Sequence, residues 1–151
     1  MLKKNINSEK ECKILGCNIS NKLNKGDVIW LEGDLGSGKT TFVKGVLKGL
    51  NYKYDVTSPT FTLINEYNAD LKVIHIDFYR ENHIQRWEEI GINEYLYSNN
   101  LVVIEWGNII NNILPDHVIR IYFEHIELNK RKIYSEYEPF SNWYFSWYVL
   151  C

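Results

Sequence analysis

Apolar positions recur along the chain with the spacing of helices in some segments and of strands in others. Ser8 and Glu11 form the sequence signature of a helix start, and apolar residues then follow at helical spacing as far as Leu23. The segment 101–106 is instead an apolar run interrupted only by Glu105, as expected of a buried parallel strand. The pattern predicts helices over residues 8–23, 40–50 and 86–97, and strands over residues 28–32, 60–67, 73–78, 101–106, 118–128 and 131–137.

The order of these predicted elements indicates the fold class. After the predicted helix over 8–23, a short apolar strand, a glycine-rich loop and a helix are followed by strands interleaved with helices, which is typical of an α/β domain with a central sheet. Strands 60–67 and 73–78 are joined by too short a connection for a parallel crossover, so they must be antiparallel if they pair. The 151 residues show no repeat or linker, so we expect one domain over residues 1–151 with a mixed sheet.

Composition narrows the classes of protein to consider. The chain is 45% hydrophobic and 24% charged, which is close to the globular average. No apolar run approaches the ~20 residues that span a bilayer. The first residues are basic but have no apolar segment behind them, so we expect a cytoplasmic protein rather than a secreted one.

Charge is distributed unevenly along the chain. Its net value of −2 makes the whole protein a poor candidate for wrapping nucleic acid. Residues 1–53 hold ten lysines and five acids, whereas residues 54–151 hold seven basic and fourteen acidic residues. The first part could meet an anion and the second a basic partner, or both could be solvated faces.

A phosphate-binding motif follows the first predicted buried strand. It reads G-x-x-x-x-G-K-T and stands between a strand and a helix, which is the context that this motif requires. Backbone N–H groups of such a loop can surround nucleotide phosphates, with Lys39 on the β- and γ-phosphates and the Thr40 hydroxyl on Mg²⁺. The motif consists of Gly33, Asp34, Leu35, Gly36, Ser37, Gly38, Lys39 and Thr40.

Two acidic residues end apolar strands and are candidates for metal binding or water activation. Glu105 ends a segment that resembles a Walker-B strand with Glu in place of the usual Asp, and Asp77 ends the strand before it. If those strands run parallel to the first, both acids lie at the edge of the sheet where α/β proteins bind ligands. The alternative for each is a surface or salt-bridged acid.

Two further segments have less certain meanings. Residues 56–61 form a hydroxyl-rich loop that could fold over a phosphate as a switch, or could simply be a loop fixed by Pro59. Residues 24–27 spell the N-K-x-D motif with which GTPases read guanine, but they precede the phosphate loop and are interpreted as a turn. ATP is therefore favoured. The four histidines, His75 among them, show no ligand spacing, so core or surface roles are expected.

Several segments together resemble the TsaE family, also called YjeE, of small bacterial P-loop ATPases. The resemblance covers roughly residues 8–133, and the order and spacing of the segments agree. The matching segments are G-D-L-G-S-G-K-T-T at 33–41, S-P-T-F-T-L at 58–63, H-I-D-F-Y-R at 75–80, E-E-I-G-I-N-E-Y-L at 88–96 and V-I-E-W at 103–106.

This resemblance implies a P-loop NTPase-like three-layer fold and an accessory role in tRNA modification. The family hydrolyses ATP with Mg²⁺, weakly alone and better with its partners TsaD and TsaB. These partners transfer a threonylcarbamoyl group to adenosine 37 of tRNAs that read ANN codons, so contact with tRNA is indirect.

The resemblance also implies roles for individual residues. Glu105 is the better candidate for positioning water, and Thr60 belongs to the switch-like loop. The implied catalytic residues are Glu105, Lys39 and Asp77, and the implied metal-binding residues are Thr40, Glu105 and Asp77. The implied nucleotide-binding residues are Gly33, Asp34, Leu35, Gly36, Ser37, Gly38, Lys39, Thr40, Thr41 and Thr60.

The chain departs from the family pattern at two places. Gly107 and Asn108 follow Trp106, where the family commonly has Pro and an acidic residue, and hydrolysis could be weaker as a result. Residues 134–151 hold eight aromatic residues that match nothing in the family, and packing against the sheet is the first interpretation. Two alternatives stay open, a nucleotide-dependent scaffold without catalysis and a small-molecule P-loop kinase. The kinase is disfavoured because the four arginines are not clustered.

Overall fold

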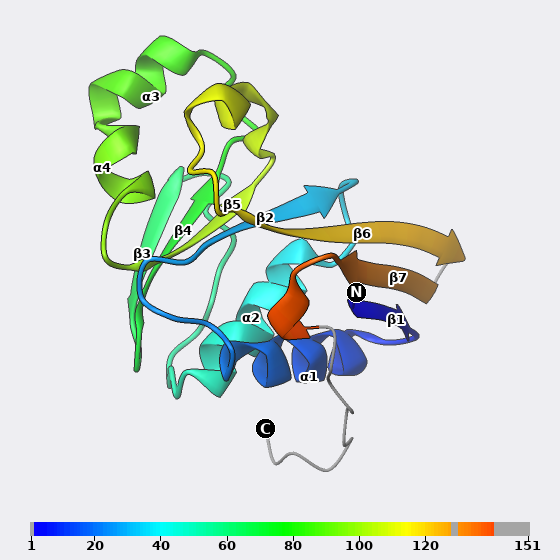
Figure 1. The fold of residues 1–151 in the computed structure, drawn as a ribbon. Helices are drawn as coiled ribbons and strands as arrows, with labels where there is room; N and C mark the ends of the chain where they lie inside the picture. The colour runs from blue at the N-terminus through cyan, green and yellow to red at the C-terminus, as the bar shows by residue number, and fades with distance from the viewer. Residues whose placement is uncertain (1, 128–129, 141–151) are drawn as a thin grey trace.

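The computed structural model describes residues 2–127 and 130–140, in which a sheet is flanked by helices (Figure 1). The strands are β1 (Leu2–Ile6), β2 (Val28–Gly33), β3 (Ile64–Asn68), β4 (Lys72–Asp77), β5 (Leu101–Glu105), β6 (Ile119–Glu127) and β7 (Lys130–Ser135). The helices are α1 (Glu9–Ser20), α2 (Lys39–Gly49), α3 (Ile84–Ile90) and α4 (Ile92–Leu96), with 3₁₀ segments η1 (Gly107–Ile113) and η2 (Glu138–Phe140).

The strands form one mixed sheet in the order β1-β7-β6-β2-β5-β4-β3. β2 runs parallel to β5 and to β6, and β4 runs parallel to β5. The β3–β4, β6–β7 and β1–β7 pairs are antiparallel. The predicted mixed sheet is confirmed, and the carboxyl ends of β2, β4 and β5 lie at one edge, where open α/β sheets bind ligands.

Each face of the sheet is covered by its own hydrophobic core. One core joins α1 and α2 to the sheet, with residues such as Leu15 and Phe42 packed against Ile29. The other lies under α3, α4 and η1, where Trp87 packs against Phe78 with ring centroids 4.1 Å apart. Figure 1 shows the α1–α2 pair on one side of the sheet and α3, α4 and η1 on the other. The three-layer architecture is therefore as predicted.

Glycines allow α1 and α2 to cross at close range. A Cβ added to Gly16 would lie 2.3 Å from the carbonyl oxygen of Phe42, and one added to Gly45 would lie 2.2 Å from that of Lys13. Both obstacles are backbone atoms, so no change of side-chain rotamer can relieve the clash. The close crossing anchors α2, and with it the phosphate loop at its amino end.

We expect Gly45→Ala to lower the free energy of unfolding by about 2–3 kcal/mol, because the added methyl group would force the two helices apart. Alanine's better helix propensity, worth about 1 kcal/mol, offsets only part of this cost. Urea denaturation measures the effect, with Lys44→Ala at an exposed position of the same helix as the control. Equal stability of the two variants would mean that the helices separate without cost.

Two predicted elements are wrong in extent because a residue takes a left-handed conformation. The strand predicted over 60–67 begins only at Ile64, since the residues before it form a turn in which Leu63 has a φ of 67°. The helix predicted over 86–97 is divided into α3 and α4 at Gly91, which has a φ of 81°. Hydrophobic spacing continues through both interruptions and therefore did not reveal them.

The sequence pattern did not predict β1, η1 or η2. β1 pairs with β7 through residues that include the buried Leu2 and Ile6. Lys4 lies between those two residues, so the strand lacks the apolar alternation by which strands are recognised. The 3₁₀ segment η1, which follows β5, was also missed.

The aromatic C-terminal segment is described as far as Phe140. Tyr134 stacks on Tyr122 with ring centroids 4.8 Å apart. Phe140 is buried in the α1–α2 core, and Tyr137 packs against it. These three aromatic side chains pack against the domain as expected, whereas the prediction for residues 141–151 lies outside the described residues.

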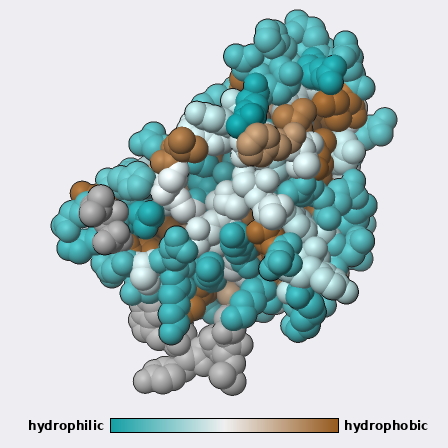
Figure 2. Space-filling model, turned by 180° about the vertical axis from the view of Figure 1, so that it is seen from behind, coloured by the Kyte–Doolittle hydropathy of each residue, from teal (hydrophilic) through white to brown (hydrophobic). Residues whose placement is uncertain are grey.

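The face of the molecule opposite to the view of Figure 1 is mainly hydrophilic (Figure 2). Viewed from behind, it shows apolar side chains in separate small patches (Figure 2). Large apolar side chains that are exposed include Leu35 and Tyr79, which border the cleft considered below. Within residues 2–127 and 130–140, no helix has both the length and the apolar character that a bilayer crossing requires.

Candidate functional site

The glycine-rich loop joins the carboxyl end of β2 to the amino end of α2. Gly36 and Gly38 have φ values of 74° and 104°, a left-handed conformation that residues with a Cβ adopt only with strain. Gly38 is the N-cap of α2 and offers no side chain to its first turn. The N–H groups of that turn therefore lack a side-chain acceptor and can bind an anion.

Lys39 is the first residue of α2, and only 4% of it is exposed. Its Nζ donates hydrogen bonds to the carbonyl oxygens of Gly33 at 2.6 Å and Asp34 at 2.9 Å, and lies 4.3 Å from the centre of the Trp106 ring. Burial lowers the pKa of Lys39, and the Glu105 carboxylate is the largest opposing influence. An ammonium group held in this way beside the loop can pair with a phosphate.

The carboxylate of Glu105 meets the hydroxyl of Thr40 at the carboxyl edge of the sheet. Thr40 Oγ1 donates a hydrogen bond to Glu105 Oε1 at 3.0 Å, although the two residues are 65 positions apart in the chain. Asp77 lies directly opposite Glu105 in the parallel β4–β5 register. Because these strands also run parallel to β2, both acids lie at the carboxyl edge of the sheet, as predicted for strands parallel to the first.

Asp77 is held by residues of the hydroxyl-rich loop. Thr60 Oγ1 donates to Asp77 Oδ2 at 2.6 Å, and the backbone N–H of Tyr79 donates to Oδ1 at 2.9 Å. Ser58 Oγ lies 2.7 Å from Thr60 Oγ1. The hydroxyl groups of this loop therefore form part of the wall around the acidic pair.

These groups line one cleft of about 480 Å³, a volume within the usual range for a small-molecule site. Gly33 and Asp34 are not in its wall but contribute the carbonyl groups that hold Lys39. The predicted residues that do line the cleft are Leu35, Gly36, Ser37, Gly38, Lys39, Thr40, Thr41, Thr60, Asp77 and Glu105.

The cleft is also lined by residues that were not predicted from the sequence, notably Cys12 and Arg131. Arg131 Nη2 donates to the carbonyl oxygen of Gly36 at 3.3 Å, and its buried Nε has no partner among the described residues. Cys12 Sγ lies 3.6 Å from the carbonyl oxygen of Gly38, and burial raises the pKa of this thiol to about 12. No sequence signal marked these residues, because β7 and α1 approach the loop only in the folded sheet.

The turn after β5 is tightly packed. Trp106 has a left-handed φ of 60°, and its ring lies 4.9 Å from that of Tyr79. A Cβ added to Gly107 would lie 2.8 Å from Ile104 Cγ2 and 3.2 Å from Trp30 Cε2. Any residue with a Cβ, proline included, would need these neighbours to shift, so the departure from the family pattern at Gly107 matches the packing of this turn.

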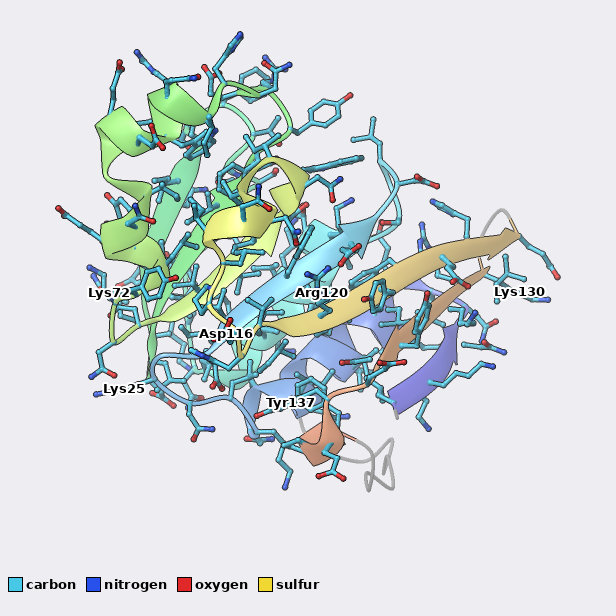
Figure 3. The ribbon with its side chains drawn as sticks, turned by 45° about the horizontal axis from the view of Figure 1, so that its top comes forward. Lys25, Lys72, Asp116, Arg120, Lys130 and Tyr137 are labelled. Atoms are coloured by element: carbon cyan, nitrogen blue, oxygen red, sulfur yellow. The ribbon has the colours of Figure 1, made fainter. Side chains whose placement is uncertain are left out.

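The N-K-x-D segment is a turn just before β2, at the edge of the sheet formed by the amino ends of its parallel strands. The backbone N–H of Asn24 donates to Asp27 Oδ2 at 2.7 Å, and that of Asp27 donates to the Asn24 carbonyl at 3.3 Å. The six-residue β2 separates this turn from the phosphate loop by about 20 Å. In Figure 3, Lys25 and Asp116 mark this edge, opposite Lys130 at the tip of the β6–β7 hairpin. The interpretation of this segment as a turn is confirmed.

The donor groups in the cleft fit a nucleotide phosphate with Mg²⁺. The Thr40 hydroxyl and the carboxylates of Glu105 and Asp77 are the oxygen ligands that Mg²⁺ prefers. Among the described residues, no group of three or more His, Cys, Asp or Glu side chains could hold a metal. Mg²⁺ commonly binds one or two carboxylates together with phosphates and water. The buried Ser37 hydroxyl, which has no described partner, offers the loop a further polar group.

Comparisons with known proteins agree on one family. Residues 6–133 match the family model described as "Threonylcarbamoyl adenosine biosynthesis protein TsaE". The tRNA threonylcarbamoyladenosine biosynthesis protein TsaE of Bacillus subtilis (strain 168) is 41% identical over 109 residues, which are 72% of this chain and 68% of that protein. The protein of the same name from Treponema pallidum (strain Nichols) is 36% identical over 118 residues, 78% of this chain and 87% of that protein. The crystal structure of Bacillus subtilis YdiB superposes with a TM-score of 0.75 and 34% identity, covering 87% of this chain and 82% of that one.

Proposed function

The chain belongs to the TsaE family of threonylcarbamoyl adenosine biosynthesis proteins, and from this premise we propose that it is an accessory ATPase of tRNA threonylcarbamoyladenosine synthesis. The observation that carries the ATPase assignment is the meeting of Lys39, Thr40 and Glu105 in one cleft, on a phosphate loop and the strand beside it. A carboxylate beside the loop threonine can hold the Mg²⁺ shell or orient the attacking water, and a nucleotide hydrolase needs both of these functions.

The proposal assigns the binding of ATP to the loop and its lysine. The backbone N–H groups of the loop and the Lys39 ammonium bind phosphates, and the Thr40 hydroxyl binds Mg²⁺. When bound, Mg²⁺ supplies positive charge that offsets the negative charge of the phosphate oxygens. Arg131 adds a second cation to the wall of the cleft.

Hydrolysis requires a group that orients the attacking water, and we assign this role to Glu105. Its side chain is 95% buried and its carboxylate is hydrogen-bonded, so the carboxylate is held in one position within the cleft. Asp77 lies beside it in register and is fixed by Thr60, which suits Asp77 to the shell around the metal. The hydroxyl-rich loop is thus assigned a role in closing the site around the terminal phosphate.

The assembly assigned to the chain follows from its family. We propose that the domain over residues 1–151 acts in the cytoplasm with TsaD and TsaB, which would carry out the threonylcarbamoyl transfer. Its contact with tRNA would then be indirect. The net charge of −2 supports this assignment, because direct RNA binding favours a basic domain.

The experiment that tests this function is a measurement of Mg²⁺-dependent ATP hydrolysis with and without purified TsaB and TsaD from the same organism. We expect slow turnover alone and faster turnover when both partners are present. EDTA is expected to abolish both rates, since the phosphates would lose their counterion. If ATP binds but is not hydrolysed under either condition, the chain acts as a nucleotide-dependent scaffold instead.

A further inference from the structure

A buried histidine stands behind the acidic residue of the cleft. His75 lies in β4 and has no exposed surface, and its strand neighbours on the same face are Val73 and Asp77. Its Nε2 lies 2.9 Å from Glu105 Oε1, on the adjacent parallel strand β5. The sequence indicated only a core or surface role for His75, whereas the fold brings its ring to Glu105.

The hydrogen bond to Glu105 indicates the tautomer of the His75 ring. An ionised Glu105 carboxylate can only accept hydrogen bonds, so we assign the His75 ring proton to Nε2, which donates the hydrogen bond to Glu105 Oε1. His75 Nδ1 is buried and has no partner among the described residues. The only hydrogen bond described for the His75 side chain is therefore the one to Glu105 in the cleft.

The hydrogen bond from His75 also restricts the orientation of the Glu105 carboxylate. Oε1 accepts hydrogen bonds from both Thr40 Oγ1 and His75 Nε2, and these are the hydrogen bonds described for this side chain. Two donors on one oxygen restrict the rotation of the carboxylate and leave Oε2 available to other groups in the cleft. The donor from β4 is rigid, since it belongs to a fully buried ring on a strand that is paired on both sides, with β3 and β5.

We propose that His75 is a positioning residue that holds the Glu105 carboxylate for water activation through the Nε2–H···Oε1 hydrogen bond. This inference rests on the proposed ATPase function. His75 does not touch the substrate in this scheme, and its contribution passes through Glu105. Groups that orient an active-site ligand in this way commonly change activity 10–100-fold when they are replaced.

Three substitutions separate the hydrogen bond from the packing of the ring. His75→Gln can place an amide N–H near the position of Nε2, whereas the shorter His75→Asn cannot reach Glu105. His75→Leu keeps an apolar volume but removes the donor. We expect the kcat for ATP hydrolysis with TsaB and TsaD to fall about 10–100-fold in the Leu and Asn variants and to be largely retained in the Gln variant. The Kd for Mg-ATP should change little in all three.

A double-mutant cycle provides the readout that a purely structural role would not affect. In a Glu105→Ala background, His75→Leu should cause no further loss of turnover, because the group through which it acts is absent. Val73→Ala, on the same face of the same strand, is the control for a loosened core and should leave kcat close to that of the wild type. If His75→Leu fails to fold, the Gln and Asn pair still tests the proposal.

The outcomes are distinguishable. If the wild type hydrolyses ATP and His75→Leu or His75→Asn has the same kcat, the positioning role is overturned and the ATPase function is left intact. A further loss in the Glu105→Ala background would also overturn it, because His75 would then act independently. Wild-type turnover no greater than that of Lys39→Ala would instead reject the ATPase function itself, together with the inference built on it.

Discussion

Replacing Lys39 with alanine is expected to reduce both the affinity for Mg-ATP and the rate of its hydrolysis, with a loss of turnover of about 100–1,000-fold. The physical reason is the loss of the buried positive charge closest to the loop. In the wild type, carbonyl oxygens at 2.6 and 2.9 Å hold this ammonium beside the loop.

Isothermal titration with Mg-ATP and a steady-state assay with TsaB and TsaD measure the two effects. Lys44→Ala is the matched control, because it removes an exposed lysine from the same helix. Circular dichroism checks that Lys39→Ala is folded. Wild-type affinity and turnover in a folded Lys39→Ala protein would contradict the assignment of the cleft as a phosphate site.

The second large effect is expected for Glu105→Gln, which should lower kcat by about 100-fold or more while leaving the Kd for Mg-ATP nearly unchanged. The amide has the shape of the carboxylate and retains an oxygen acceptor, but it has no negative charge with which to activate water. Affinity depends mainly on the loop and Lys39, and the substitution alters neither of them.

The comparison of kcat with Kd is what makes this test specific. Glu66→Gln on β3, an exposed acid paired with Lys72, controls for the general loss of one negative charge. Equal losses of affinity and turnover in Glu105→Gln would assign the residue to metal and nucleotide binding alone. Undiminished turnover would transfer the catalytic role to Asp77, the acid opposite it in the β4–β5 register.

The sequence was most informative where function depends on a short continuous segment. The phosphate loop, the strand before it and the helix after it were all predicted, because a loop that binds phosphate needs its glycines and lysine at fixed positions. The acids Asp77 and Glu105 were found because each ends an apolar strand. The sequence predicted that these acids lie at the same edge of the sheet only if their strands run parallel to the first. The β2–β5 and β4–β5 pairs are both parallel.

Predictions failed where one residue changes the direction of the backbone. Leu63 and Gly91 interrupt patterns that otherwise read as a longer strand and a longer helix. Gly91 could have indicated a helix end, but the helical spacing of its apolar neighbours favoured one long helix. Nothing in the sequence around Leu63 indicated a positive φ. Its N–H is bonded to the carbonyl oxygen of Pro59, in the turn that brings Thr60 to Asp77.

The sequence by itself determined the fold class, the family, the phosphate loop and the identity of the two acids, because each of these depends on local spacing or on residue type. Only the tertiary structure decided which distant groups complete the cleft. Arg131 and Cys12 reach the loop through the packing of β7 and α1, and His75 reaches Glu105 across neighbouring strands. Such contacts depend on strand order and register, which are set by how the whole sheet and its two helical layers bury their apolar faces.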